Sequence, residues 1–275
     1  MADIPYKLLV LDIDGTLMNR DGIISPEDAG ALAKAGEAGI KVALSTGRAI
    51  QSSLKVLERL SLDGYHIFFD GALVYDPEKN RELYASQIKI EPLEEIIDFT
   101  HNLGLDIDLY SIIDYFVARE TWITDIRRNF YNLHPVVVDL KKTMLEEKII
   151  KCAIVVFSPE EKAKTELIRQ RFAGRLNFSF TGTPAYPEMD FINVIAPGVS
   201  KGKALEVMAS FLEIPLANVM AVGDGTNDIS LLSTAGLGVA MGSSPDELKT
   251  VADYITLDVA KSGVAAAINK FLLKP

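Results

Sequence analysis

The 275-residue chain has little cysteine and little histidine: it contains one cysteine and three histidines. Cys152 can form no disulfide within the chain, which favours a reducing compartment, and we expect the cytoplasm. It lies in the apolar run 149–157, which is typical of a buried thiol rather than a reactive one. No serine-and-acid pattern accompanies the histidines, and we assign structural or surface roles to His66, His101 and His134.

Positively charged residues are also fewer than negatively charged ones. The chain has 28 lysine and arginine residues against 38 aspartate and glutamate residues, a formal net charge of −10. A nucleic-acid backbone would be repelled, and no dense basic run offsets this. No stretch approaches the roughly 18 apolar residues of a membrane span, and Asp3 and Lys7 interrupt any leader-like start. We therefore expect no nucleic-acid and no membrane partner, while the oligomeric state stays open.

The composition is that of a globular protein. Hydrophobic residues make up 48% of the chain and charged residues 24%, enough for one large domain or two ordinary ones. Strand-like and helix-like segments alternate in residues 1–84 and again in 191–275, which predicts β-α-β units and a parallel sheet. We predict an α/β fold, with a Rossmann-like doubly wound core in these two segments and a second, α+β domain inserted at 85–190.

Two of the apolar runs that we expect to be strands end in acidic pairs. The run beginning at Leu8 leads into Asp12 and Asp14, and a later one leads into Asp224 and Asp228. The carboxyl ends of parallel strands meet at one edge of a sheet, where α/β proteins bind ligands. Four carboxylates there would repel one another, and a cation removes that conflict. Oxygen ligands without histidine or cysteine favour a hard ion, with Mg²⁺ the leading candidate.

Other interpretations of these loops fail on spacing. An EF-hand beginning at Asp12 would need glycine where Leu17 stands. A dinucleotide-binding loop beginning at Gly223 would need glycine where Asp228 stands, and that carboxylate would repel a pyrophosphate.

Two further positions could form a phosphate subsite. Thr46 and Gly47 follow a predicted strand and precede a helix, where a hydroxyl and backbone N–H groups can hold an anion. Lys201 is expected in the first turn of its helix, where a cation opposes the helix dipole, which suggests another use. Plain helix capping and a solvated surface lysine are the alternatives.

Four segments together resemble the motifs of the haloacid dehalogenase superfamily, in that family's order. They are Asp-Ile-Asp-Gly-Thr-Leu at 12–17, Ser-Thr-Gly-Arg at 45–48, Ser-Lys-Gly-Lys-Ala-Leu at 200–205 and Gly-Asp-Gly-Thr-Asn-Asp at 223–228. The insertion between the second and third motifs is similar to the α/β cap of the class IIB, Cof-type phosphatases. The resemblance covers essentially the whole chain.

The resemblance implies a role for each matched residue. Asp12 would be the nucleophile that forms an aspartyl-phosphate, and Asp14 would protonate the leaving group and then activate water. The phosphoryl group would be bound by Thr46, Gly47, Lys201 and Asn227. Mg²⁺ would be held by Asp12, the backbone carbonyl of Asp14, Asp224 and, through its water shell, Asp228.

Two positions depart from the family pattern. Asp70, in Asp70-Gly71-Ala72, stands where relatives usually carry asparagine, and so does Ser243. Asp70 could repel a phosphate, contact a sugar hydroxyl, or simply accept backbone N–H bonds in a turn. Substrate contacts carried over from relatives are therefore in doubt at both positions.

These features together predict a Mg²⁺-dependent phosphatase that hydrolyses a small phosphorylated metabolite, with a sugar phosphate as the first candidate. The alternatives are a sugar phosphomutase and a non-catalytic protein that binds a phosphometabolite. The sequence does not name the substrate.

Overall fold

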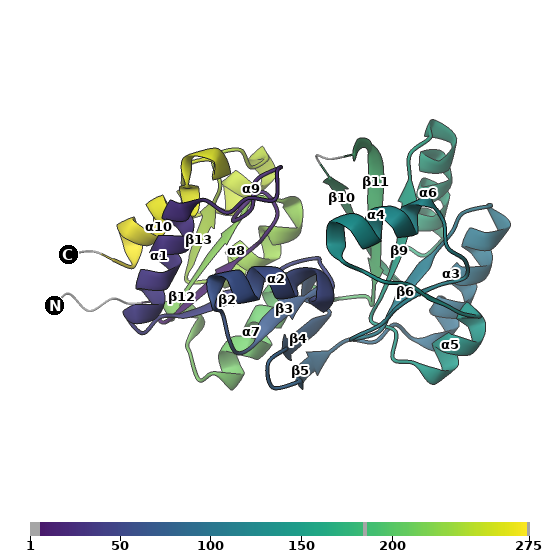
Figure 1. Cartoon of the computed structure of the whole chain (residues 1–275), viewed down its shortest axis with the longest axis horizontal. Helices are drawn as coiled ribbons and strands as arrows, with labels where there is room; N and C mark the ends of the chain where they lie inside the picture. The colour runs from purple at the N-terminus through teal and green to yellow at the C-terminus, as the bar shows by residue number, and fades with distance from the viewer. Residues whose placement is uncertain (1–5, 184–185, 274–275) are drawn as a thin grey trace. The chain divides into compact units, whose positions relative to one another are not determined.

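The structure is a computed structural model that describes residues 6–183 and 186–273. These residues belong to two compact units, each built around a sheet of its own (Figure 1). The first unit takes in the chain as far as Gly47, then Leu54–Tyr84 and the residues from Ser200 onward. The second comprises Arg48–Ser53 and Ala85–Val199.

A five-stranded parallel sheet forms the centre of the first unit. Its strand order is β14-β13-β12-β1-β2, with bounds Tyr254–Ile255, Leu237–Ala240, Val219–Gly223, Leu8–Leu11 and Lys41–Leu44. From β1 the chain moves outward to β2, whereas from β12 it moves the other way to β13 and β14. The order therefore reverses between β1 and β12, which pair from Leu8↔Val219 to Leu11↔Val222. This confirms the predicted doubly wound sheet and gives it a topological switch point, where such sheets bind ligands.

Helices cover both faces of this sheet. On one face, α7 (Lys201–Phe211) and α8 (Ile229–Thr234) pack against alternate strand residues such as Val10. On the other side in Figure 1, α1 (Pro26–Glu37) and α10 (Gly263–Phe271) pack against each other. Because both faces are covered, successive residues of β1 are all buried, as its apolar sequence predicts. The remaining helices of this part of the chain are α2 (Ile50–Leu60) and α9 (Asp246–Val251).

The sequence predicts a serine cap at Ser25, which precedes Pro26, and another at Ser200, and both are present. Ser25 accepts from the Asp28 N–H at the start of α1, and Ser200 accepts from the Lys203 N–H at the start of α7. The run Ser-Pro-Asp-Glu at 244–247 predicts a capping box at Ser244, and this prediction is wrong. The α9 helix begins at Asp246 with Pro245 in the capping position and no side-chain hydrogen bond there.

A second, three-stranded sheet continues from the edge of the first. It consists of β3 (His66–Phe68), β4 (Leu73–Asp76) and β5 (Arg81–Ala85). The 3₁₀ turn η1 (Phe69–Gly71) connects the first two of these strands. The junction with β2 is a single bridge between Ser45 and Ile67. Beside it, the Leu44 N–H donates to Nδ1 of the fully buried His66 at 3.1 Å.

The second unit holds a six-stranded sheet in the order β10-β11-β9-β6-β7-β8. The bounds of these strands are Asn177–Thr183, Tyr186–Ile195, Lys151–Val156, Asp108–Tyr110, Tyr115–Val117 and Val136–Val137. Its helices are α3 (Ile90–Asn102), α4 (Trp122–Tyr131), α5 (Leu140–Glu146) and α6 (Pro159–Arg171). Three of them, α3, α5 and α6, bury a core with the sheet that includes Cys152. Burial raises the pKa of that thiol, so it stays protonated and inert.

The second unit extends further along the chain than the predicted insertion. It ends at Val199 rather than at residue 190, because β11 continues to pair with β9 as far as Ile195↔Lys151. Two elements of this unit, β8 and α5, are two and seven residues long and were not predicted from the sequence. Segments this short carry too few positions for a periodic pattern to show.

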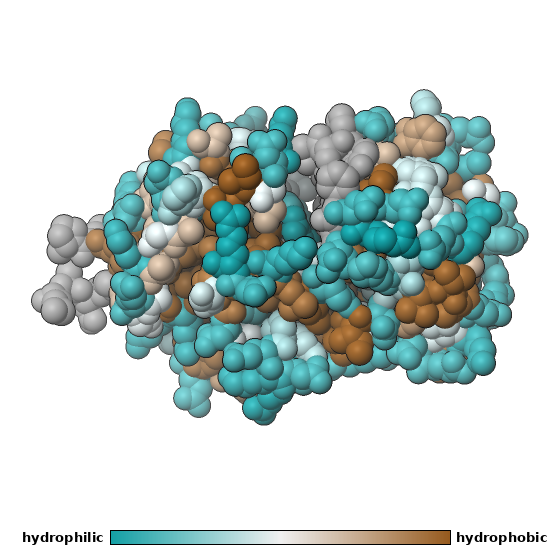
Figure 2. All heavy atoms as spheres, viewed as in Figure 1, coloured by the Kyte–Doolittle hydropathy of each residue, from teal (hydrophilic) through white to brown (hydrophobic). Residues whose placement is uncertain are grey.

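The face of the molecule drawn in Figure 2 is mainly polar. Hydrophilic residues cover most of the face drawn in Figure 2, and the hydrophobic ones form separate patches. Among the residues described, none of the helices has the length and apolar character that crossing a membrane requires.

The buried ring of His66 predicts a pH dependence of stability. Burial lowers the pKa of His66 from 6.5 to about 4, whereas the unfolded chain takes up this proton near pH 6.5. The unfolded state therefore binds more protons between these pH values, and the free energy of unfolding falls by about 3 kcal/mol as the pH drops through them. Urea unfolding at pH 7 and pH 4 measures this loss.

The matched control is His66→Asn, whose side-chain oxygen can accept from Leu44 but does not titrate. Its loss of stability between the two pH values should be smaller by about 3 kcal/mol. An equal loss in both proteins would show that His66 does not carry the effect.

Candidate active site

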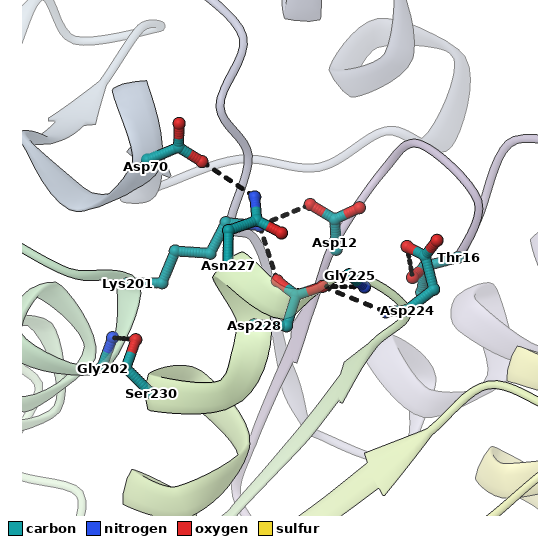
Figure 3. A network of polar contacts seen from close by, with 10 residues as sticks. All are labelled: Asp12, Thr16, Asp70, Lys201, Gly202, Asp224, Gly225, Asn227, Asp228 and Ser230. Carbon is teal, nitrogen blue, oxygen red and sulfur yellow. Dashed lines mark hydrogen bonds and ion pairs between the residues drawn. The ribbon is translucent and has the colours of Figure 1, made fainter. Parts of the chain in front are cut away.

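The two acidic loops meet at the switch point of the parallel sheet. Asp12 directly follows β1, and Asp224 directly follows β12. Asp12, Asp224 and Asp228 each offer an oxygen, and the three oxygens lie within 4.8 Å of one another. Three of the four carboxylates expected to converge therefore lie together, although they are separated by about 210 positions of sequence (Figure 3).

A buried lysine lies between these loops. Lys201 is the first residue of α7, and its Nζ lies 2.6 Å from Oδ1 of Asp12 and 2.6 Å from Oδ1 of Asp228 (Figure 3). Its side chain is 0% exposed, so it is no solvated surface lysine. Burial acts to lower the pKa of Lys201, but the carboxylates of Asp12, Asp228 and Asp70 outweigh it and the pKa is raised. The lysine is therefore held charged at the centre of the site.

Asp228 also organises the loop that carries it. Its Oδ2 accepts from the backbone N–H groups of Asp224 and Gly225, at 3.0 Å each. A Cβ on Gly223 would lie 2.5 Å from the Asp228 carboxyl carbon, so this residue must be glycine for the loop to close. Asp228 thus joins the backbone of one loop to the ammonium of Lys201.

Thr16 holds the third carboxylate. Its fully buried hydroxyl donates to Oδ1 of Asp224 at 2.9 Å. Any side chain on Gly15, whose φ is +88°, would collide with Asp224. No role was predicted for Thr16, although a hydroxyl residue just after two acids in the sequence was an available signal.

The charges in this cluster are not balanced by Lys201 alone. Burial raises the pKa of Asp224 to about 7, and the nearby charge of Asp228 adds to the effect. Burial also raises the pKa of Asp12, against the opposing effect of Lys201. Three oxygen donors with surplus negative charge fit a divalent cation, and the absence of nitrogen and sulfur donors from the three favours a hard one.

Asp14 lies apart from this cluster. Its side chain is exposed, and it does not belong to the group of three converging carboxylates. An exposed carboxyl can exchange protons with water and with a bound ligand, as its predicted acid and base role requires. The metal contact expected of its backbone carbonyl stays a prediction.

Three of the four residues expected to bind a phosphoryl group lie around Asp70. The Asp70 N–H donates to the Thr46 carbonyl oxygen at 3.0 Å, and Nδ2 of Asn227 donates to Oδ1 of Asp70 at 2.9 Å. A Cβ on Gly47 would lie 2.8 Å from the same carboxylate. Thr46, Gly47 and Asn227 therefore lie together. Asp70 is 4% exposed, and its carboxylate accepts from a side chain of another loop, so it does not only accept backbone N–H bonds in its own turn. Ser243, by contrast, is an exposed turn residue.

Comparison with known proteins identifies the family. A family model described as haloacid dehalogenase-like hydrolase matches residues 9–268. The chain belongs to the haloacid dehalogenase-like hydrolases. The resemblance seen in the four sequence motifs is thereby confirmed, as is the expectation of an enzyme.

Relatives of this haloacid dehalogenase-like hydrolase extend over nearly its whole length. The 5-amino-6-(5-phospho-D-ribitylamino)uracil phosphatase YcsE of Bacillus subtilis (strain 168) is 28% identical over 271 residues, which cover 98% of each chain. An HMP-PP phosphatase of Yersinia pseudotuberculosis is 29% identical over 272 residues, 98% of this chain and 97% of its own. A solved structure described as a subclass IIB sugar phosphatase is 26% identical with a TM-score of 0.78, covering 96% of this chain and 98% of that one.

The buried ion pairs of this hydrolase predict the effect of removing their cation. Lys201→Met would leave the carboxylates of Asp12 and Asp228 buried without their counter-charge. We expect the free energy of unfolding to fall by about 3–5 kcal/mol. Urea unfolding in the presence of EDTA measures this loss, because the chelator prevents a metal ion from replacing the lysine.

The double variant Lys201→Met, Asp12→Asn is the matched control. It removes one of the two unpaired carboxylates, so part of the lost stability should return. If Lys201→Met is as stable as the original chain, the lysine does not hold the loops together.

Proposed function

We propose that the protein is a Mg²⁺-dependent phosphatase that hydrolyses a small phosphorylated metabolite, with a sugar phosphate as the first candidate. The observation that carries the proposal is the convergence of Asp12, Asp224 and Asp228 at the switch point of the sheet, with Lys201 bonded to the first and last of them. This arrangement offers negative groups for a cation and one fixed positive charge for an anion. A phosphoryl group needs both.

Asp12 is the proposed nucleophile. It stands at the end of β1, and Lys201 fixes the direction of its carboxylate. Attack of a carboxylate oxygen on phosphorus forms an aspartyl-phosphate and releases the alcohol of the substrate. Asp14 donates the proton that this alcohol takes up, and then accepts a proton from the water that hydrolyses the intermediate.

The charge developed by the phosphoryl group is offset by donors of the same site. Lys201, the hydroxyl of Thr46, the N–H of Gly47 and the amide of Asn227 supply them. When bound at Asp12, Asp14, Asp224 and Asp228, Mg²⁺ would neutralise further negative charge on the phosphoryl oxygens.

The substrate class follows from chemistry that the relatives share. They are a 5-amino-6-(5-phospho-D-ribitylamino)uracil phosphatase, an HMP-PP phosphatase and a sugar phosphatase. A phosphate group on a small organic molecule is common to their substrates, and it is the part of the substrate that the described site could bind.

Replacing the nucleophile tests the reaction. Asp12→Asn should reduce release of inorganic phosphate to background on a Mg²⁺-supplemented panel of phosphorylated metabolites, because an amide cannot attack phosphorus. Asp14→Asn should lower kcat by about 10²–10⁴-fold, the usual contribution of acid–base catalysis. Circular dichroism checks that both variants fold.

Three outcomes would overturn this assignment. Undiminished phosphate release by Asp12→Asn would show that Asp12 is not the nucleophile. Isomerised sugar phosphate in place of free phosphate, dependent on a bisphosphate activator, would indicate a phosphomutase. Binding of a panel compound without any turnover would indicate a non-catalytic protein.

Binding of Mg²⁺ should stabilise the fold. An ion that binds only the folded state raises the free energy of unfolding by about 2.7 kcal/mol at one hundred times its dissociation constant. Thermal unfolding with and without Mg²⁺ measures this gain. The Asp224→Asn variant should lose most of this stabilisation by Mg²⁺. If Mg²⁺ stabilises the variant as much as the original chain, the ion binds elsewhere.

A further inference from the structure

The turn between β3 and β4 has an unusual backbone. Phe69, Asp70 and Gly71 have φ values of +52°, +55° and +98° in succession. A left-handed backbone is uncommon for residues other than glycine, and more so for a bulky one such as phenylalanine. Such conformations persist where the surrounding structure enforces them, which is often at functional sites.

This turn connects three segments of the candidate active site. Asp70 donates its N–H to the carbonyl oxygen of Thr46. Gly71 lies so close to the Ser200 carbonyl oxygen, at the start of the helix that carries Lys201, that any side chain there would collide with it. The Asp70 carboxylate contacts Asn227. The left-handed backbone therefore places this one carboxylate among the residues proposed to bind phosphate.

The contact between Asp70 and Asn227 determines which end of the Asn227 side-chain amide faces Asp70. A carboxylate accepts hydrogen bonds and donates none, whereas a side-chain amide has a donating end and an accepting end. Beside Asp70, only the nitrogen of Asn227 makes a favourable contact, and Nδ2 lies at 2.9 Å. The amide oxygen lies on the side of Gly225, 2.6 Å from the position that a Cβ would take there.

We propose that Asp70 is a positioning residue, which holds the Asn227 amide with its nitrogen toward the phosphoryl subsite. One N–H of Nδ2 bonds to Asp70, and the second donates to a phosphoryl oxygen. With the amide reversed, its oxygen would face the anion and repel it. Asp70 acts through Asn227 and does not touch the substrate. This role rests on the proposed function.

Asp70 and a phosphoryl group are both negative, so direct repulsion predicts the opposite effect. If repulsion prevailed, removing the carboxylate would strengthen the binding of phosphate. If Asp70 acts through Asn227, removing it weakens that binding, and only while Asn227 is present. The sign of the effect and its dependence on Asn227 decide between the two.

Calorimetric titration of inorganic phosphate in the presence of Mg²⁺ provides the test and needs no turnover. Asp70→Gly removes the carboxylate and tolerates the left-handed backbone. We expect it to weaken phosphate binding about tenfold or more, the effect of losing one hydrogen bond to a charged group. Asn227→Ala should weaken binding by a similar factor, and the double variant should bind no more weakly than Asn227→Ala alone.

Asp70→Asn is the conservative control. Asparagine also tolerates the left-handed region, and its side-chain oxygen can accept from Nδ2, so most of the binding should return. The exchanged pair Asp70→Asn, Asn227→Asp keeps the total charge and the hydrogen bond but puts a carboxylate where the donor stood. It should bind phosphate as weakly as Asn227→Ala, or more weakly.

The inference is overturned by tighter phosphate binding in Asp70→Gly, by equal losses from Asp70→Gly with and without Asn227, or by unimpaired binding in the exchanged pair. If the original chain binds no phosphate, this inference and the proposed function both fail. If the expected binding pattern is found but the chain releases no phosphate from any compound, only the proposed function fails.

Discussion

The active-site end of the first unit depends on one buried positive charge. Lys201 bonds at 2.6 Å to carboxylates from two different loops, Asp12 after β1 and Asp228 after β12. A charged group inside a protein is tolerated only when it is paired, and removal of its partner is costly. The same bonds therefore join α7 to both loops and fix where Asp12, the proposed nucleophile, lies. A surplus of negative charge remains, and a divalent cation could offset it.

The backbone and small residues near these loops allow the carboxylates to lie close together. Gly15 and Gly223 leave room for the carboxylates of Asp224 and Asp228. Thr16 and the N–H groups of the second loop hold those carboxylates in place. Around Asp70 the chain adopts a left-handed turn that most residues avoid. Several departures from ordinary local preference thus lie around this cluster, as is usual where function rather than stability selects the residues.

The sequence was sufficient for those parts of the fold that follow from local pattern. Apolar runs ending in acids predicted β1 and β12 and placed their carboxylates at one edge, because parallel strands share a direction. Serine and proline predicted the start of α1. The rest depends on contacts between distant residues. No local signal pairs Thr16 with Asp224 or Asp70 with Asn227, which lie 208 and 157 positions apart. Ser244 was misassigned because a capping pattern can occur where the backbone does not use it.

The central claim is that the phosphoryl group passes through the carboxylate of Asp12. The most direct measurement is mass spectrometry of the protein after rapid acid quenching during turnover of p-nitrophenyl phosphate with Mg²⁺. Borohydride reduction before digestion converts an acyl phosphate at an aspartate to homoserine, which marks the residue. The account predicts homoserine at position 12, and more of it in Asp14→Asn, which cannot activate water for the second step. Turnover without any such mark at position 12 would contradict it.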